Sequence, residues 1–344
     1  MRPMTSNESI PSAWQLLAPV MDLVTPMAVR VAATLRLPDL LADGPRNAEE
    51  LAERSGTDAD ALRRLLRHLI GQGVFAEPSP GRFALNETAG LLRSDHPSRM
   101  RMWLDLDGFG GRMDLAFTGL MHTVRTGRPA WETVFGTPFW DHLAADPALV
   151  ASFDATMAGS LRTTAVTGYD WSGVRHVVDV GGGTGALLAE VLRAAPGVRG
   201  TLVDLPGTVA RGRHLLAKRG LDGRCEFVGQ SFFDPLPPGA DVYLLSGVLH
   251  DWADEPATAI LRRCAEAAGE TGRVVIVEWY GTSGDGPAVS AEMDLRMLVL
   301  CGGRERGPGD YRSLAASAGL EVADVLTVSS GHVLIDCRFA AGGS

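Results

Sequence analysis

The second half of the chain alternates short apolar runs with amphipathic stretches. The apolar runs, which predict strands, lie near 176–180, 200–204, 225–228, 241–246 and 273–278. Helical patterns separate these runs and lie near 184–194, 207–219 and 255–268. Near-continuous apolar strands interleaved with helices are typical of a parallel sheet that is covered on both faces. We therefore expect an α/β fold in this half of the chain.

The end of the chain predicts a different strand connection. After a helix near 308–318, two strands are expected at about 322–329 and 331–338, joined by Ser-Ser-Gly. A connection this short suits a hairpin, so the sheet should end with an antiparallel strand.

The first hundred or so residues have mainly helical patterns. One amphipathic pattern begins at Ala28, another helix follows Asn47 as its N-cap, and a third covers 58–69. The stretch 74–85 predicts a small hairpin, and two short helices followed by a hairpin resemble a winged helix. The stretch 100–170 is again helical in pattern and rich in large apolar side chains.

Composition and charge narrow the function classes. The 344 residues carry a net charge of −9, which is a poor match for nonspecific binding to nucleic acid. No apolar run approaches the roughly 20 residues needed to span a bilayer. The first residues lack the basic and apolar regions of a secretory signal, and the four cysteines contain no C-x-x-C pair. We expect a cytoplasmic protein that binds neither nucleic acid nor membrane.

A glycine-rich loop follows the first strand of the sheet, in VVDVGGGTG. Gly181, Gly183 and Ala186 formally match the G-x-G-x-x-[GA] pattern of dinucleotide-binding loops. Asp179, two positions before the first glycine, argues against a diphosphate, because a carboxylate would repel it from the following helix N-terminus. The same carboxylate suits the ammonium or sulfonium region of S-adenosylmethionine, which we therefore expect as the cofactor.

The next two strands supply the rest of the predicted cofactor site. Asp204 and Leu205 end the second strand, and a carboxylate there can accept hydrogen bonds from both ribose hydroxyls. This contact would fit a nicotinamide cofactor equally well. In SFFDPLP, Ser231 could bond the adenine edge, and Phe232 could either stack on adenine or belong to the core.

Six sequence motifs follow one another along the chain: VVDVGGGTG, LVDLP, SFFDPLP, LSGVLHDWADE, VVIVE and MDLRMLVLCGGRER. Motifs of these kinds occur in the same order and at the same spacing in one known family. On these stretches the chain resembles the S-adenosylmethionine-dependent O-methyltransferases that act on small aromatic natural products. These are the plant caffeic-acid type and its actinobacterial polyketide-tailoring relatives, and the resemblance covers essentially the whole chain. It implies a Rossmann-like class I methyltransferase sheet, mostly parallel with an antiparallel last strand, plus a mainly α-helical, winged-helix-like N-terminal domain.

The resemblance also implies an assembly and a division of the chain. Residues 1–105 would form the dimerisation domain of a homodimer, 106–170 a helical linker lining the substrate pocket, and 171–344 the catalytic domain. S-adenosyl-L-methionine would be the cofactor and S-adenosyl-L-homocysteine its product.

His250 follows the fourth strand, where a substrate is expected to bind outside the carboxyl ends of the strands. A phenol is mostly protonated at neutral pH, so a histidine there can take its proton while the oxygen attacks a methyl group. The resemblance implies the same role for His250, with Glu278 and Glu305 beside it. Either glutamate could instead pair with an arginine such as Arg304 or Arg306.

The resemblance implies further contacts. Ser246 matches a cofactor position where plant members carry lysine, and Ser231 stands where many relatives carry aspartate. The substrate candidates, the last three of them weaker, are Met157, Met297, Trp103, Asp251 and Trp252. The acidic residues of HDWADE are explained by the start of a helix, where negative charges are favourable, and they need no metal ion. We therefore expect a metal-independent enzyme.

Some features of the chain also fit other functions. Asp179 disfavours a nicotinamide oxidoreductase, and His250 argues against a family relative that decarboxylates or hydroxylates its substrate. Methylation at nitrogen or carbon stays open. The winged-helix-like segment, with its basic 63–68 stretch, could also belong to a DNA-binding regulator, which the acidic charge disfavours. Aromatic polyketides, naphthoic acids and tyrosine-derived phenols all fit as the small aromatic substrate.

Overall fold

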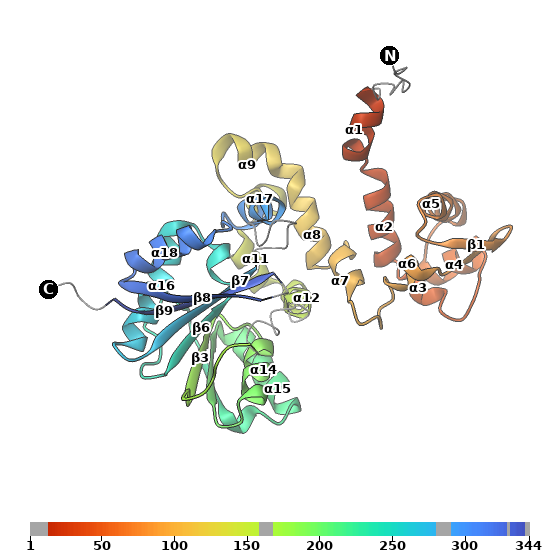
Figure 1. The fold of residues 1–344 in the computed structure, drawn as a ribbon. Coiled ribbons are helices and arrows are strands. Elements are labelled where there is room, and N and C mark those ends of the chain that lie inside the picture. Colours follow the sequence, from red (N-terminus) through yellow and green to blue (C-terminus); the bar gives the residue numbers. More distant parts are fainter. Residues whose placement is uncertain (1–12, 158–167, 280–289, 329–330, 341–344) are drawn as a thin grey trace, which may run out of the picture. The chain divides into compact units, whose positions relative to one another are not determined.

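The structure is a computed structural model, and it describes residues 13–157, 168–279, 290–328 and 331–340. The chain divides into two compact units, Met1–Arg112 and Met113–Ser344. Figure 1 shows the helices and strands of both units, coloured along the sequence. The three-part division expected from the sequence stays a prediction.

The first unit is mainly helical. Its helices are α1 (Ala13–Met21), α2 (Val24–Thr34), α3 (Leu37–Leu40), α4 (Ala48–Ser55), α5 (Ala59–Gly71), α6 (Glu87–Gly90) and α7 (Met100–Leu104). Strands β1 (Ala76–Ser79) and β2 (Arg82–Ala84) form the predicted antiparallel hairpin. Asn47 caps α4 as predicted, since its side chain accepts a hydrogen bond from the backbone N–H of Glu50 and the Glu50 side chain accepts one in return.

The amphipathic pattern that begins at Ala28 does not form one helix. Helix α2 starts earlier, at Val24, and ends at Thr34. Arg36 then has a φ of +54°, and Pro38 sits in the first turn of α3. Proline restricts the residue before it and cannot donate a backbone hydrogen bond, so the apolar pattern continues across a break in the helix.

The second unit opens with short helices. These are α8 (Phe109–Leu115, which crosses the unit boundary), η1 (Ala116–Gly119), α9 (Leu120–Thr126), α10 (Trp131–Phe135), α11 (Phe139–Ala145) and α12 (Pro147–Met157). Trp131 is fully buried among them, with its ring 4.5 Å from that of Phe135 and 4.9 Å from that of Phe139 between centroids. This aromatic packing explains why the stretch is rich in large apolar residues.

A seven-stranded sheet forms the centre of the second unit, in the order β5-β4-β3-β6-β7-β9-β8. The strands are β3 (His176–Val180), β4 (Arg199–Asp204), β5 (Cys225–Gly229), β6 (Val242–Ser246), β7 (Arg273–Trp279), β8 (Leu320–Thr327) and β9 (His332–Phe339). Neighbouring strands are parallel except that β9 is antiparallel to both β7 and β8. The predicted class I methyltransferase architecture is confirmed.

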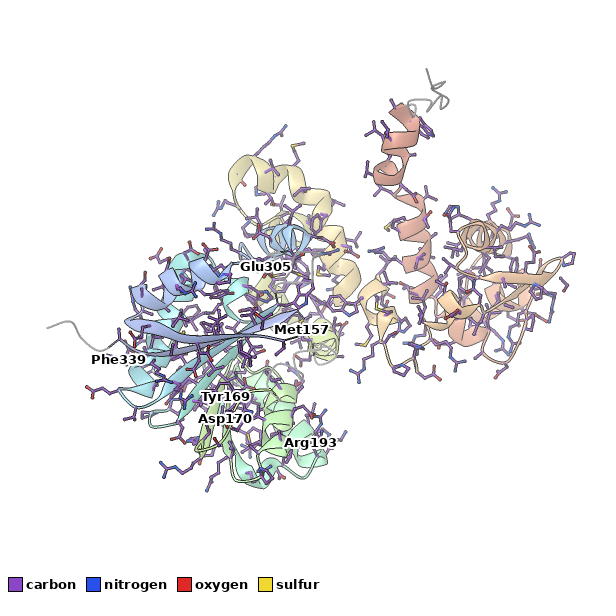
Figure 2. The ribbon with its side chains drawn as sticks, viewed as in Figure 1. Met157, Tyr169, Asp170, Arg193, Glu305 and Phe339 are labelled. Carbon is purple, nitrogen blue, oxygen red and sulfur yellow. The ribbon has the colours of Figure 1, made fainter. Side chains whose placement is uncertain are left out.

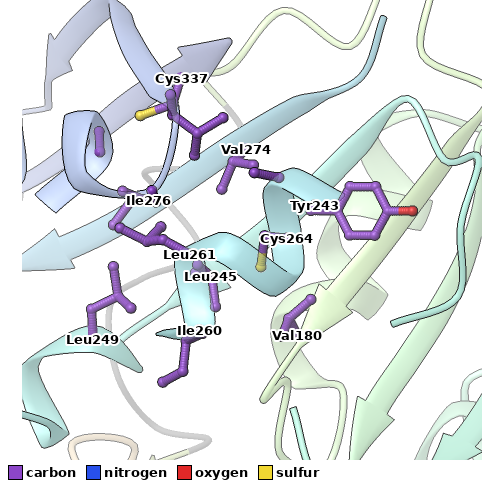
Figure 3. Packing of buried hydrophobic residues seen from close by; sticks show 14 of the residues in the cluster. Val180, Tyr243, Leu245, Leu249, Ile260, Leu261, Cys264, Val274, Ile276 and Cys337 are labelled. Atoms are coloured by element: carbon purple, nitrogen blue, oxygen red, sulfur yellow. The ribbon is translucent and has the colours of Figure 1, made fainter. Parts of the chain in front are cut away.

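Helices cover both faces of this sheet: α14 (Ala186–Ala194) and α15 (Pro206–Lys218) one face, and α16 (Asp254–Ala268) and α18 (Pro308–Ser317) the other. The remaining elements are α17 (Ala291–Leu300), which packs with α9 and η1, and the short η2 (Asp222–Arg224) and η3 (Leu249–Asp251). Alternate side chains of a strand point to opposite faces. Accordingly, Tyr243 and Leu245 pack with α16 and α18 (Figure 3), whereas Val242 and Leu244 pack with α14 and α15. Strands buried on both sides produce the continuous apolar runs seen in the sequence.

The parallel arrangement brings the carboxyl ends of β3, β4, β5, β6 and β7 to one edge of the sheet. Ligands of open α/β sheets bind at this edge. Among the described residues, no helix combines the length and the apolar character that crossing a membrane requires.

Candidate active site

The loop after β3 is shaped by glycine. Gly181, Gly183 and Gly185 have φ angles of +66°, +58° and +73°, a region that residues with a side chain rarely adopt. Gly182 is needed for a different reason, because a Cβ there would lie 2.5 Å from the carboxylate of Asp179. Asp179 itself is 1% exposed and lies directly under the loop. The buried carboxylate and the bare backbone beside it fit a cationic ligand.

Asp204 ends β4 and connects to the same loop. Its Oδ2 atom accepts a hydrogen bond of 2.9 Å from the backbone N–H of Gly183, and its Oδ1 accepts one of 2.7 Å from Leu205. Burial raises the pKa of Asp204, and the two backbone donors only partly offset this. Each carboxylate oxygen can accept a second hydrogen bond, so Asp204 fits the ribose hydroxyls of an adenosine cofactor. Leu205 is half exposed and precedes α15.

The remaining cofactor candidates lie at the same edge. Phe232 follows β5, and a Cβ on Gly181 would lie 3.4 Å from its ring. This places the phenyl ring beside the glycine loop, although it also packs against the core. Ser231 uses its hydroxyl to accept a hydrogen bond of 3.2 Å from the backbone of Phe233. Ser246 is the last residue of β6, and its Oγ is buried.

His250 lies in η3, a short turn that begins three residues after the end of β6. Its Nδ1 atom is 2.8 Å from Oε1 of Glu305 and 4.0 Å from Oε2 of Glu278, which is 2% exposed (Figure 2 labels Glu305). On the other side of the ring, Nε2 is 3.6 Å from Oδ1 of Asp251. A hydrogen bond from Nδ1 to Glu305 fixes the neutral tautomer in which Nε2 accepts a proton.

The pKa of His250 is set by competing effects. Burial lowers it, but the negative charges of Glu278, Asp251 and Glu305, with the hydrogen bond to Glu305, outweigh burial and raise the pKa to about 9. Three carboxylates around a buried imidazole therefore produce a base that is stronger than ordinary histidine. Such a base is well matched to a phenolic hydroxyl, whose own pKa is about 10.

The arginines that could have competed for the glutamates bind elsewhere. Arg306 contacts Asp254 through Nε and Nη2 at 3.0 and 2.8 Å, and Arg304 lies 3.4 Å from the same carboxylate. Glu305 is thereby left to the imidazole. Among the described residues, no group of three or more histidine, cysteine, aspartate or glutamate side chains is arranged to hold a metal ion.

The substrate candidates are brought together only in part. Trp252 and Asp251 adjoin His250 in η3 and the residue after it. Met297 is buried in α17, and Met157 is the last residue of α12 (Figure 2). Trp103 belongs to α7 in the other unit, and its assignment to the pocket stays a prediction.

The structure adds one aromatic residue that sequence reasoning missed. Trp140 of α11 stacks on Trp252, with ring centroids 5.9 Å apart and an angle of 10° between the planes. Phe233 meets the edge of the same Trp252 ring at 5.0 Å. The only signal in the sequence was the abundance of aromatic residues in that helical stretch, which does not identify a particular one.

The strand order and the acidic residues at the strand ends are those of a class I methyltransferase-like fold that binds an adenosine cofactor. A model of the O-methyltransferase domain matches residues 117–321, and a model of the O-methyltransferase dimerisation domain matches 20–95. The chain belongs to this O-methyltransferase family. The family resemblance, the enzyme class and S-adenosylmethionine as cofactor are thereby confirmed.

Individual relatives span almost the whole chain. The 2,7-dihydroxy-5-methyl-1-naphthoate 7-O-methyltransferase of Streptomyces carzinostaticus is 49% identical over 88% of this chain and 91% of its own length. Aclacinomycin 10-hydroxylase RdmB of Streptomyces purpurascens is 47% identical over 92% of this chain and 86% of its own length. The crystal structure of NcsB1 in complex with S-adenosylmethionine and 2-hydroxy-5-methyl naphthoic acid has a TM-score of 0.87, with 46% identity over 93% of this chain and 98% of that chain.

Proposed function

We propose that this enzyme methylates a hydroxyl group of a small aromatic natural product, with His250 as the general base. The observation that carries the proposal is the imidazole held by Glu305 through Nδ1, which leaves Nε2 to accept a proton. This imidazole stands at the same sheet edge as Asp179 and Asp204. The family membership supports methyl transfer from S-adenosylmethionine, which supplies an already activated methyl group when bound.

The chain's own residues bind, orient and move a proton. Asp179 and the glycine loop would hold the cationic part of the cofactor, and Asp204 its ribose, with Ser231, Phe232 and Ser246 beside them. His250 Nε2 takes the proton of the substrate hydroxyl as the oxygen becomes a nucleophile. Glu305 and Glu278 stabilise the imidazolium that results, because both carboxylates lie within 4.0 Å of Nδ1. Trp252 and the two methionines, Met157 and Met297, would provide apolar surface for the aromatic ring.

The substrate class follows from the relatives together with this site. One relative is named for a dihydroxynaphthoate, and NcsB1 was solved with naphthoic acids. We therefore infer a hydroxylated bicyclic aromatic acid as the first class of acceptor to test. The product would belong to secondary metabolism, as antibiotic biosynthesis does for several relatives.

Hydroxylation is the second candidate reaction, because RdmB is named as a hydroxylase at 47% identity. The two reactions give products of different mass. Purified enzyme would be incubated with S-adenosylmethionine and a panel of hydroxynaphthoic acids, in the presence and absence of a metal chelator. A gain of one methylene with equimolar S-adenosylhomocysteine, unaffected by the chelator, is expected. A gain of one oxygen, or no product from any phenol, would contradict the proposal.

We also infer a homodimer. Helices α1 and α2 and their junction expose large apolar side chains, including Val20 at 80%, Leu23 at 75% and Trp14 at 69%. Large apolar side chains exposed this densely along one stretch usually mark an interface. The match to a dimerisation domain model over 20–95 supports a second copy of the chain as the partner. The four cysteines are free thiols, which suits a reducing compartment, so we infer a cytoplasmic enzyme.

A further inference from the structure

The segment that carries Glu305 packs directly on the backbone of η3. The backbone N–H of Arg304 donates a hydrogen bond of 2.8 Å to the carbonyl oxygen of His250. Gly303 permits this approach, because a Cβ there would lie 2.1 Å from the same oxygen. The backbone N–H of Glu305 also donates to Asp294 at 2.9 Å. The carboxylate that binds the imidazole therefore belongs to a segment that is itself fixed against the imidazole's own turn.

Arg306 ties this segment to both ends of the turn. Its side chain is buried, and its Nη1 atom donates to the carbonyl oxygen of Leu249 at 2.8 Å. Its Nη2 atom donates to the carbonyl oxygen of Trp252 at 2.7 Å. The two carbonyls immediately flank His250 and Asp251 in the sequence. Arg306 thus holds the residue before and the residue after the pair that carries the site's chemistry.

The remaining donors of Arg306 are also used. Nε and Nη2 bind Oδ1 of Asp254 at 3.0 and 2.8 Å, and Nη1 lies 3.3 Å from the carbonyl oxygen of Arg304. A guanidinium has five N–H groups in a fixed planar fork, and these contacts employ all of them. The charge is paired with that of Asp254, which reduces the cost of burying the cation. The ammonium group of lysine has three donors and no planar fork, so it could not reproduce the set.

We propose that Arg306 is a positioning residue for the catalytic base, whose guanidinium holds the turn around His250 in the conformation that keeps the imidazole against Glu305. This rests on the proposed function, which makes His250 the base. Arg306 acts through the backbone. The charged groups that face the imidazole itself are Glu278 from β7, Asp251 from η3 and Glu305, none of which Arg306 contacts through its side chain.

The test uses a readout that needs no substrate. The pH titration of the His250 imidazole would be followed by NMR in the full-length wild type, with the signal assigned by its loss in His250→Ala. Arg306→Met keeps an unbranched apolar side chain and removes every donor, whereas Arg306→Lys keeps the charge. The control is Arg262→Met, because Arg262 is an exposed arginine that also donates to a backbone carbonyl, that of Ser317, at 3.0 and 3.2 Å.

Loss of the hydrogen bonds that Arg306 makes to the turn should let His250 move away from Glu305. In Arg306→Met the titration midpoint of His250 should fall by about one unit or more towards that of ordinary histidine, with a smaller fall in Arg306→Lys. Where methylation is measurable, the plateau value of kcat above pH 9, where the imidazole is deprotonated in both proteins, should fall by about ten- to a hundredfold, with the KM for S-adenosylmethionine within about twofold. Arg262→Met should change neither quantity.

Other outcomes separate the two proposals. If Arg306→Met or, should that variant not fold, Arg306→Lys has a lower Tm but an unchanged His250 titration, Arg306 only stabilises the fold and the positioning role is overturned. If the titration shifts while neither wild type nor variant methylates any phenol, the positioning role stands and the proposed function fails.

Discussion

Glu305 and His250 are 55 positions apart in the sequence and meet at 2.8 Å between Oε1 and Nδ1. Glu278, from a different strand, approaches the same nitrogen only to 4.0 Å. The first glutamate therefore orients the ring through a hydrogen bond, whereas the second acts through its charge. The two acids are not equivalent, and variants of the base and of its neighbours should separate their contributions.

Replacing His250 with alanine should remove proton transfer and little else. We expect kcat to fall by roughly 10²–10⁴-fold, the usual contribution of a positioned general base. Affinity for S-adenosylmethionine, measured by calorimetry, should stay within about twofold, because Asp204 is held by the backbone N–H groups of Gly183 and Leu205 and not by the imidazole. His214→Ala is a matched control, since His214 is exposed on α15. Equal turnover in His250→Ala and wild type would remove the base assignment.

The pH dependence of catalysis should report the raised pKa of His250. With a pKa of about 9, most of the free enzyme carries a protonated imidazole at neutral pH. The value of kcat/KM should therefore rise about tenfold per pH unit below 9 and then level off. Removing a negative charge makes the protonated imidazole of His250 less stable. Glu278→Gln should therefore move the rising part of the profile to lower pH. An unmoved rising part in Glu278→Gln would show that its charge does not act on the base.

The comparison of Glu278→Gln with Glu305→Gln separates charge from orientation. Glutamine at 305 can still accept a hydrogen bond from Nδ1, but it also offers N–H groups that can turn towards the ring. We expect both variants to shift the rising part of the pH profile to lower pH. Only Glu305→Gln should also lower the plateau value of kcat. Rate profiles recorded in buffers of constant ionic strength measure both quantities. Equal plateau losses would mean that Glu278 also orients the ring.

The sequence was sufficient for the sheet and for the acids at its edge. Strands such as 176–180 are buried on both faces, so they appear as continuous apolar runs that a single sequence reveals. Asp179 and Asp204 stand where such runs end, and the parallel arrangement brings strand ends together. The pattern beginning at Ala28 misled because apolar spacing continues across the break before Pro38. Local pattern therefore predicts elements better than their ends.

Contacts between distant residues were not accessible in the same way. Glu305 lies between Arg304 and Arg306, and the sequence alone allowed it to pair with an arginine instead of His250. The packing of Arg306 on Asp254 and on two carbonyls decides the question. Backbone carbonyls have no signature in a sequence, because every residue has one. For the same reason the hydrogen bonds from Arg306 to the η3 turn could be found only from the structure, whereas the glycine loop is visible in the sequence.

Asp204→Asn should weaken cofactor binding before it affects anything else. The amide retains one acceptor oxygen, whereas the carboxylate offers two, and hydrogen bonds to charged groups contribute about 1.5–3 kcal/mol each. The Kd for S-adenosylhomocysteine should rise by about ten- to a hundredfold, measured by calorimetry. Asp222→Asn, an exposed acid in η2, serves as the control. An unchanged Kd in Asp204→Asn would mean that Asp204 does not bind the ribose.

Gly182→Ala should disturb the acid below the glycine loop. The added methyl would lie 2.5 Å from the Asp179 carboxylate and 2.6 Å from Leu202, and neither side chain has space to withdraw. Crowding of this kind typically lowers the free energy of unfolding by about 1–3 kcal/mol. A lower Tm and weaker cofactor binding are expected together. Gly197→Ala has no heavy atom within 4 Å of the added methyl and should be close to neutral in both measurements.

The apolar surface of α1 and α2 should determine the assembly. Glutamate at Val20 and Leu23 would place two charges where both side chains are more than 70% exposed in one chain, so the fold of the single chain has no reason to change. In a dimer buried through this surface the same charges would be desolvated without partners, which is costly. Light scattering after size exclusion should give a dimer for wild type and a monomer for Val20→Glu/Leu23→Glu. Val124→Glu, at a position 70% exposed on α9, is the matched control and should remain a dimer. A monomeric wild type would contradict the homodimer, and a double variant that stays dimeric would show that the dimer forms through another surface.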